Sequence, residues 1–123
     1  MPSSTNAGTQ TSAGATSGLQ PAIQVSALEL YDTYHTNEVS VDATYKDELL
    51  EVGGLVTSIN RDFMGQPYLL LLAKDEFSNV HSTFPMSAEV SVSRKAKGDF
   101  VTLRCRGTGM ILGSPVLNDC ALR

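Results

Sequence analysis

The sequence predicts a small, mainly β domain, in which a barrel of five short strands follows one helix. From residue 49 onward, apolar and polar residues alternate in short segments that turn residues separate. An amphipathic helical pattern precedes these segments over residues 26–37. Five short strands with a helix-sized insert before the fourth strand are typical of a small barrel.

Length and composition limit what the chain can be. Its 123 residues allow one domain, of which 41% of residues are hydrophobic and 18% are charged. Nine basic and thirteen acidic residues give a net charge of -4, whereas a generic nucleic-acid binder usually has a basic excess. The longest apolar run, residues 68–73, is far shorter than the roughly 20 residues of a membrane-spanning helix. We therefore expect no such helix.

The N-terminal segment differs in composition from the rest of the chain. Of residues 1–20, 14 are Ser, Thr, Gly or Ala, and none is charged. Such a segment has too little apolar surface to offset the entropy cost of ordering. We predict a flexible tether over residues 1–24 and the folded domain over residues 25–123; a disordered terminus without a function is the alternative. The segment lacks the basic start and apolar core of a signal peptide, so an exported protein would have its leader upstream of Met1.

The folded part begins with a strong helix signal. Ser26 and Glu29 have the spacing of a capping box, in which both side chains bind unpaired backbone N–H groups. An apolar stripe follows at helical spacing, formed by Ala27, Leu30, Tyr31 and Tyr34. The helix is predicted to end near Asn37, and a second short turn is expected at residues 41–45.

The first two predicted strands form a hairpin. Residues 49–60 are the first strand, and Gly53 and Gly54 interrupt its alternation, which predicts a β-bulge at this pair. Residues 61–66 are the hairpin loop. Residues 67–73 are the second strand, whose four consecutive leucines indicate burial on both faces, with a binding surface on one face as the alternative.

Three further strands are predicted in the second half of the chain. A charged turn at residues 74–76 leads to a third strand over residues 78–84. Residues 86–97 fit either a short helix or a strand. The fourth and fifth strands are predicted over residues 100–106 and 116–122.

The two cysteines, Cys105 and Cys120, lie on the last two predicted strands. A two-residue turn at residues 112–113 would pair positions whose numbers sum to 225. This register places the two cysteines opposite each other. It also creates an apolar pair and a pair of opposite charges, which are Leu103–Leu122 and Arg106–Asp119.

We therefore predict a disulfide between Cys105 and Cys120, which would place the protein in an oxidising compartment. The loop that this bond closes predicts a stabilisation of about 3 kcal/mol. Two buried free thiols in a cytosolic protein are the alternative. A zinc site is not expected, because no His lies near the two cysteines in the sequence.

The sequence contains no recognisable catalytic motif, so no catalytic residue, cofactor or metal site is predicted. Carboxylates at residues 47–51 could attract a divalent cation, but a surface charge cluster is the favoured interpretation. The basic residues at positions 94–97 are likewise interpreted as a solvated turn rather than as a phosphate contact. The candidate ligand-binding residues are aromatic, imidazole and cationic side chains of the strands and the first loop: Arg61, Phe63, Tyr68, His81, Arg104 and Arg106.

Several motifs resemble the tRNA-anticodon-like OB-fold family of small bacterial proteins, many of which are lipoproteins or envelope proteins. The resemblance covers about residues 26–122, and one departure is Val41, where a smaller residue is expected. It implies a five-stranded Greek-key OB-fold barrel with an N-terminal helical extension, an upstream lipid or secretory anchor, and no catalytic residues. The residues that carry it are Ser26-Ala27-Leu28-Glu29-Leu30-Tyr31, Tyr34, Asn37-Glu38-Val39, Asp42, Tyr45-Lys46, Leu50-Glu51-Val52-Gly53-Gly54-Leu55-Val56, Ile59, Gly98-Asp99-Phe100-Val101, Cys105, Gly107 and Asp119-Cys120.

Two functions follow as hypotheses. The first is a non-catalytic OB-fold binding module in the periplasm or envelope of a bacterium, with a protein or envelope ligand and a membrane link only through an upstream lipid anchor. The alternative function is a single-stranded nucleic-acid binder, and the alternative location of the protein is the cytoplasm. That function needs stacking aromatic residues and a basic groove, and the acidic composition argues against the groove. A hydrolase has no nucleophile and base to support it. The sequence gives no prediction of ligand identity or oligomeric state.

Overall fold

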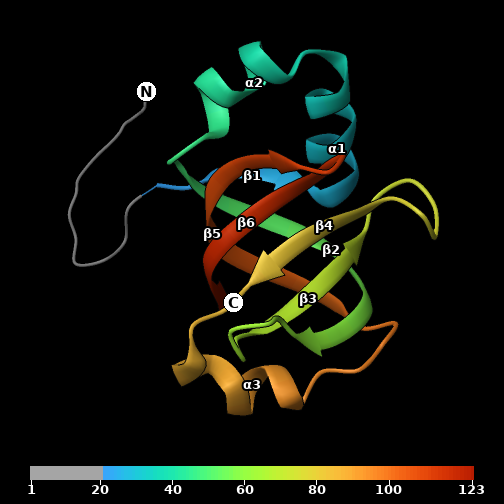
Figure 1. Ribbon diagram of the computed structural model, residues 1–123, viewed down its shortest axis with the longest axis vertical. Coiled ribbons are helices and arrows are strands. Elements are labelled where there is room, and N and C mark those ends of the chain that lie inside the picture. The colour runs from blue at the N-terminus through green and yellow to red at the C-terminus, as the bar shows by residue number, and fades with distance from the viewer. Residues whose placement is uncertain (1–20) are drawn as a thin grey trace, which may run out of the picture.

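The computed structural model describes residues 21–123 and shows one six-stranded sheet that closes into a ring (Figure 1). The order β2-β3-β4-β6-β5 returns to β2, with β4 and β6 parallel and the other pairs in the ring antiparallel. The mainly β prediction is therefore confirmed, and the five expected strands correspond to β2 through β6. The strands are β1 (Ile23–Ser26), β2 (Leu49–Arg61), β3 (Pro67–Leu72), β4 (Asn79–Thr83), β5 (Phe100–Ile111) and β6 (Ser114–Leu122).

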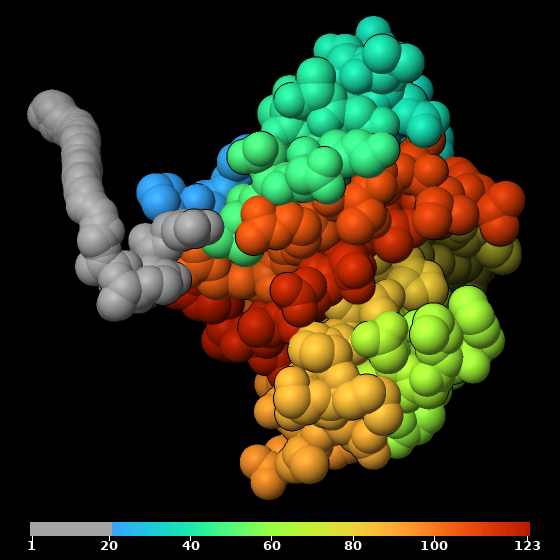
Figure 2. All heavy atoms as spheres, turned by 60° about the vertical axis from the view of Figure 1, so that its left-hand side comes forward, coloured from blue at the N-terminus to red at the C-terminus, as the bar shows by residue number. Residues whose placement is uncertain are grey.

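Helices lie at the two ends of the ring. At one end, α1 (Ala27–Thr36) and α2 (Glu38–Tyr45) form the lobe at the top of Figure 2, and α3 (Glu89–Ser93) lies at the opposite end. A short 3-10 helix, Met86–Ala88, precedes α3, so residues 86–93 of the ambiguous segment 86–97 are helical, and residues 94–97 are neither helix nor strand. Within residues 21–123, none of the helices has the length and apolar character needed to cross a membrane.

Capping side chains fix where the first two helices begin. The Ser26 hydroxyl accepts a hydrogen bond from the backbone N–H of Glu29 at 3.0 Å, so the predicted helix start is confirmed. Asn37 ends α1 as predicted, and its side chain also accepts from the backbone N–H of Ser40 at 3.1 Å. This second cap makes α2 a full helix rather than the short turn expected at residues 41–45.

The first strand was not predicted. β1 pairs in parallel with Leu50–Gly53 of β2, so Ile23 and Gln24, which were predicted to end the tether, belong to the sheet. Only Val25 of its four residues is buried, and a strand this short leaves no periodic pattern to detect. Residues 1–20 of the predicted tether lie outside the described residues.

The core lies inside the ring and is closed at both ends by helices. Leu69 and Leu71 of β3 are fully buried, whereas Leu70 and Leu72 are partly exposed on the outer face. The predicted burial of both β3 faces is therefore wrong for the part of the chain that the structure describes, in which the outer face of this strand stays partly exposed. Each end contributes helical side chains to the core, which are Ala27, Leu30 and Tyr34 of α1, Val41 of α2 and Val92 of α3.

The predicted β-bulge at Gly53 and Gly54 is also wrong. Pairing of β2 with β5 is regular from Leu49 to Leu55, and the register shift lies between Val56 and Ser58. Gly54 is required for another reason. A Cβ atom at this position would lie 3.0 Å from the Ala27 Cβ and 3.2 Å from the Leu71 Cβ, so it has no space between α1 and β3.

Gly54→Ala is expected to lower the free energy of unfolding by about 1–3 kcal/mol through overpacking. Gly53→Ala is a matched control, because the one close neighbour of its Cβ would be the exposed Phe100 ring, at 3.1 Å, and the Val101 carbonyl would be at an ordinary contact distance of 3.9 Å. Urea unfolding of the two variants measures the difference. Equal losses of stability at the two positions would contradict this account of Gly54.

The last two strands form the predicted hairpin, with two irregularities. Leu112 and Gly113 form its turn with φ angles of 51° and 83°, as a tight two-residue turn requires. The predicted register holds at both ends, where Leu103 pairs with Leu122 and Ile111 with Ser114. Two register shifts lie between them.

These shifts change one predicted pair but preserve the disulfide. Arg106 lies opposite Asn118 rather than Asp119, because Asp119 adopts a φ of 54° at the irregularity and is not part of the paired ladder. Cys105 and Cys120 are bonded, with their Cα atoms 4.1 Å apart, and both side chains are buried in the core.

Candidate functional site

The outer sides of β3 and β4 form a continuous surface, which we call the β3–β4 face. Its members alternate with core residues and are all half-buried. Loop 62–66 lies at one end of this face, where β3 begins. The 112–113 turn lies near the other end, because β6 starts there and runs parallel to β4. The face consists of Tyr68, Leu70, Leu72, Asn79, His81 and Thr83.

Two of the predicted binding residues meet on this face. Tyr68 lies opposite Thr83, and His81 lies opposite Leu70, so Tyr68 and His81 are diagonal neighbours on adjacent strands. Their rings stack with centroids 4.2 Å apart and an interplanar angle of 23°. The register thus brings two stacked rings together in the half of the face that lies next to loop 62–66.

The β3–β4 face carries no formally charged side chain. Burial lowers the pKa of His81 below its ordinary value, and the nearby Asp62 carboxylate only partly opposes this effect. The imidazole is therefore neutral at pH 7 and offers one hydrogen-bond donor and one acceptor. This combination suits a ligand with aromatic, apolar or neutral polar groups.

The lowered pKa of His81 predicts a loss of stability in acid. The unfolded chain binds a proton on His81 as the pH falls through about 6.5, whereas the folded protein resists this protonation until lower pH. This contribution to stability is therefore complete above pH 6.5 and decreases below it. His81→Gln should reduce the dependence of the free energy of unfolding on pH in this range, as measured by urea unfolding between pH 7.5 and 5. Parallel pH curves for the two proteins would contradict the assignment.

Arg61, at the edge of this face, forms hydrogen bonds with two other residues. Its Nη2 donates to Glu89 Oε2 of α3 at 2.6 Å, and its Nη1 donates to the carbonyl of Gly65 at 3.1 Å. The hydrogen bond to Glu89 raises the pKa of Arg61, and the same contact lowers the pKa of Glu89. Arg61 therefore joins the β2–β3 loop to α3 and is not a free cation beside the face.

Phe63 lies at the tip of the same loop, and its side chain is almost completely exposed. The Asp62 carboxylate fixes the loop by accepting from the backbone N–H groups of Met64 and Gln66, each at 2.9 Å. Gly65 has a φ of 85°, as expected for the predicted turn glycine. The ring of Phe63 is thus presented to solvent by an ordered loop.

The other two arginines lie on a different part of the ring. Arg104 and Arg106 belong to β5, and β2 or β6 separates this strand from the β3–β4 face on either side. Arg104 lies opposite Glu51 in the register, and the Nη1 of Arg106 donates to the Asp47 carbonyl at 3.0 Å. The six predicted residues therefore do not form one site.

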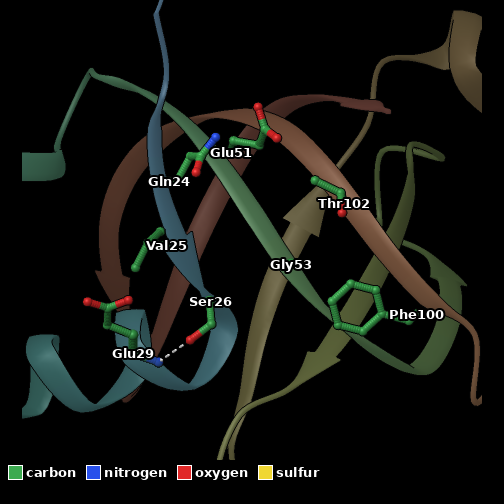
Figure 3. Close-up of a pocket in the computed structure, with 8 residues that line it drawn as sticks. All are labelled: Gln24, Val25, Ser26, Glu29, Glu51, Gly53, Phe100 and Thr102. Carbon is green, nitrogen blue, oxygen red and sulfur yellow. Dashed lines mark hydrogen bonds between the residues drawn. The ribbon is translucent and has the colours of Figure 1, made fainter.

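A hollow of about 400 Å³ lies where β1, β2, β5 and α1 meet (Figure 3). Gly53, which has no side chain, lies at its centre, and Phe100 lies at one side. Glu51 forms an ion pair with Arg123 at 3.0 Å. The sequence could not indicate this hollow, because β1 was not predicted. Its lining residues are Gln24, Val25, Ser26, Glu29, Glu51, Gly53, Phe100 and Thr102.

The carboxylates at residues 47–51 do not assemble into a metal site. Among residues 21–123, no group of three or more His, Cys, Asp or Glu side chains has the arrangement of metal ligands. The Glu51 carboxylate pairs with Arg123, whereas the contact of Arg106 is to the backbone carbonyl of Asp47 and does not involve its carboxylate.

Comparison with known families decides the relationship of this chain. The tRNA_anti-like family model matches residues 2–121. The chain belongs to the tRNA_anti-like family. This finding confirms the resemblance that the sequence motifs indicated.

A solved structure shares the fold of this tRNA_anti-like protein. It is the crystal structure of a "putative nucleic acid-binding lipoprotein" from Klebsiella pneumoniae, with a TM-score of 0.64 and 15% sequence identity. The match covers 81% of this chain and 92% of the other chain. At this identity, the likeness concerns the fold alone. A comparison with curated proteins gives no significant match.

Proposed function

We propose that this tRNA_anti-like protein is a non-catalytic OB-fold binding module of the bacterial envelope, with the β3–β4 face as its binding surface. The ring order β2-β3-β4-β6-β5, with parallel β4 and β6, supports an OB-fold assignment for strands β2 to β6. OB-folds bind ligands on their second and third strands and the adjoining loops, which correspond here to β3, β4, loop 62–66 and the 112–113 turn.

The character of the face supports a protein segment or a neutral envelope component as the ligand. The observation that carries this proposal is the Tyr68–His81 stack on a surface without charged side chains. Stacked rings give a flat contact for apolar or aromatic groups, and the half-buried His81, Asn79 and Thr83 can provide hydrogen bonds that orient a ligand.

The buried disulfide supports placement in the envelope. Such bonds form and persist in oxidising compartments such as the bacterial periplasm. The Klebsiella pneumoniae structure is described as a lipoprotein, which fits the same location. In this proposal, an upstream lipid anchor tethers the protein covalently to a membrane.

Single-stranded nucleic-acid binding is the second candidate function. The Tyr68–His81 stack and the exposed Phe63 favour it, because aromatic rings can stack on successive bases. The description of the Klebsiella pneumoniae protein points the same way. This function also needs cations along the face, yet Arg61 is paired with Glu89, and Arg104 and Arg106 lie on β5.

NMR spectroscopy can locate the binding surface directly. We expect soluble peptidoglycan fragments or an apolar peptide library to shift the Tyr68 and His81 ring signals, with loss of binding in Tyr68→Ala. Tyr31→Ala is a matched control, because Tyr31 stacks on His35 of α1 at 4.1 Å with the same 23° angle, away from the face. Shifts confined to the hollow around Gly53, or equal loss in both variants, would contradict the proposed surface.

A further inference from the structure

The charges of this protein are distributed along its long axis. Helices α1 and α2 span residues 27–45, which contain four acidic residues and no Lys or Arg, whereas residues 86–99, which include α3, contain two acidic and three basic residues. The acidic helices α1 and α2 lie at one end of the molecule, and α3 lies at the other end (Figure 1). The net charge of -4 is therefore distributed unevenly between the two ends of the molecule.

Three cations follow α3 without neutralising partners. Arg94, Lys95 and Lys97 form no ion pair or side-chain hydrogen bond with residues 21–123, and Arg94 and Lys97 are exposed. Elsewhere in the same part of the chain, Arg61, Lys74 and Arg123 each pair with a carboxylate. Three cations without a carboxylate partner among residues 21–123 therefore lie within four positions of the chain, directly after α3.

Large apolar side chains are exposed at the same end. The Arg61–Glu89 ion pair holds the β2–β3 loop against α3, so the exposed residues of the two segments lie near each other. The exposed fractions are 99% for Phe63, 71% for Met64, 62% for Val90 and 51% for Met86. We call these four residues, together with Arg94, Lys95 and Lys97, the α3 end.

We propose that the α3 end docks on an anionic lipid surface. Apolar side chains at the tips of a loop and a short helix can enter the interfacial layer of a bilayer, while adjacent cations bind lipid phosphates. The same lipid charge would repel the acidic α1–α2 end, so the protein would stand with α3 toward the membrane. The β3–β4 face extends between the two ends and would stay open to a ligand, although docking does not depend on that ligand.

Vesicle co-sedimentation tests this proposal. The protein should bind vesicles of phosphatidylcholine and phosphatidylglycerol in equal parts and should dissociate from them in 0.5 M NaCl. It should not bind vesicles of pure phosphatidylcholine. The triple variant Arg94→Gln, Lys95→Gln, Lys97→Gln should reduce the partition coefficient on the order of 100-fold. The matched control Lys46→Gln, Lys74→Gln, Arg123→Gln changes the net charge equally, at sites outside the α3 end, and should have a much smaller effect. Equal losses in the two triple variants would overturn the proposal.

A second pair of variants tests the apolar contribution without changing charge. Phe63→Ser should weaken vesicle binding, whereas Phe77→Ser should not, because Phe77 is equally well exposed but lies in the β3–β4 loop, which Lys74 joins to Asp32 of α1. Both positions are on the surface, so thermal unfolding should show that each variant folds. Two further results would overturn the proposal: equal binding to both lipid compositions, or binding of a single-stranded oligonucleotide through the three cations in preference to vesicles.

Discussion

Replacing Gly107 with Ala is expected to lower the free energy of unfolding by about 3 kcal/mol, the upper part of the usual range for overpacking. A Cβ atom at this position would lie 2.3 Å from the carbonyl oxygen of Tyr45, which is part of the backbone and cannot rotate away. The strand is also held there, because Gly107 donates to the Glu48 carbonyl at 3.0 Å and accepts from the Asp47 N–H at 2.8 Å. Relief of the clash must therefore break the contact between the end of α2 and β5.

Urea unfolding monitored by circular dichroism measures this effect. Gly53→Ala provides the control, since it makes the same chemical change in β2, the neighbour of β5, where the close neighbour is the exposed Phe100 ring rather than backbone. A Gly107→Ala protein with the stability of the control would show that α2 is not held against β5 at this point. Helix content below that of the wild type would indicate that α2 separates from the sheet, as the close contact predicts.

Removing the disulfide is expected to cost about 3 kcal/mol, because the bond restricts the unfolded chain. Cys105 and Cys120 lie on adjacent strands, β5 and β6, and the bond closes the loop that contains the 112–113 turn. Both side chains are in the core, so Cys105→Ala with Cys120→Ala also creates a small cavity. The double variant should therefore unfold at a clearly lower urea concentration than the wild type.

A reductant separates the effect of the bond from the effect of the cavity. Reduction should shift the unfolding midpoint of the wild type toward lower urea and leave the double variant unchanged. The difference between reduced wild type and double variant then measures the cavity. A wild type that is insensitive to the reductant, with two free thiols by mass spectrometry, would contradict the bond and its support for an envelope location.

Features set by neighbouring residues could be predicted from the sequence. The helix start at Ser26, the loop with Gly65 and the turn at Leu112 and Gly113 each depend on side chains or φ angles within a few residues. The disulfide was also predictable, because a two-residue turn relates all positions of the following hairpin, and the two register shifts leave Cys105 and Cys120 close enough to bond.

Features set by distant segments could not be predicted. β1 is a strand because β2 offers it a free edge, and its four residues carry no pattern of their own. The Gly53-Gly54 pair suggested a bulge, but Gly54 is required by α1 and β3, which approach it in three dimensions. The true irregularity, at Thr57, lies in a stretch where no glycine marks it.

The candidate site shows the same division. Alternation placed His81 on the face of its strand opposite Phe84, whereas the run of leucines after Tyr68 led to the wrong expectation that both faces of that strand are buried. The stacking of Tyr68 on His81 depends on the register between β3 and β4. Arg104 and Arg106 were correctly placed on one strand, yet their distance from the face follows from the order in which the ring closes. The charge of the surface around Tyr68 could therefore not be derived from the sequence.

The central claim is that this tRNA_anti-like protein uses an uncharged face for a ligand other than nucleic acid. Fluorescence anisotropy with a labelled single-stranded 20-mer of DNA or RNA, in a salt series, tests it most directly. We expect no binding tighter than roughly 10⁻⁵ M near physiological salt, the range of non-specific contacts, because the face has no cations to neutralise phosphates. Submicromolar binding that weakens with salt and disappears in Tyr68→Ala would contradict the claim and assign the face to nucleic acid.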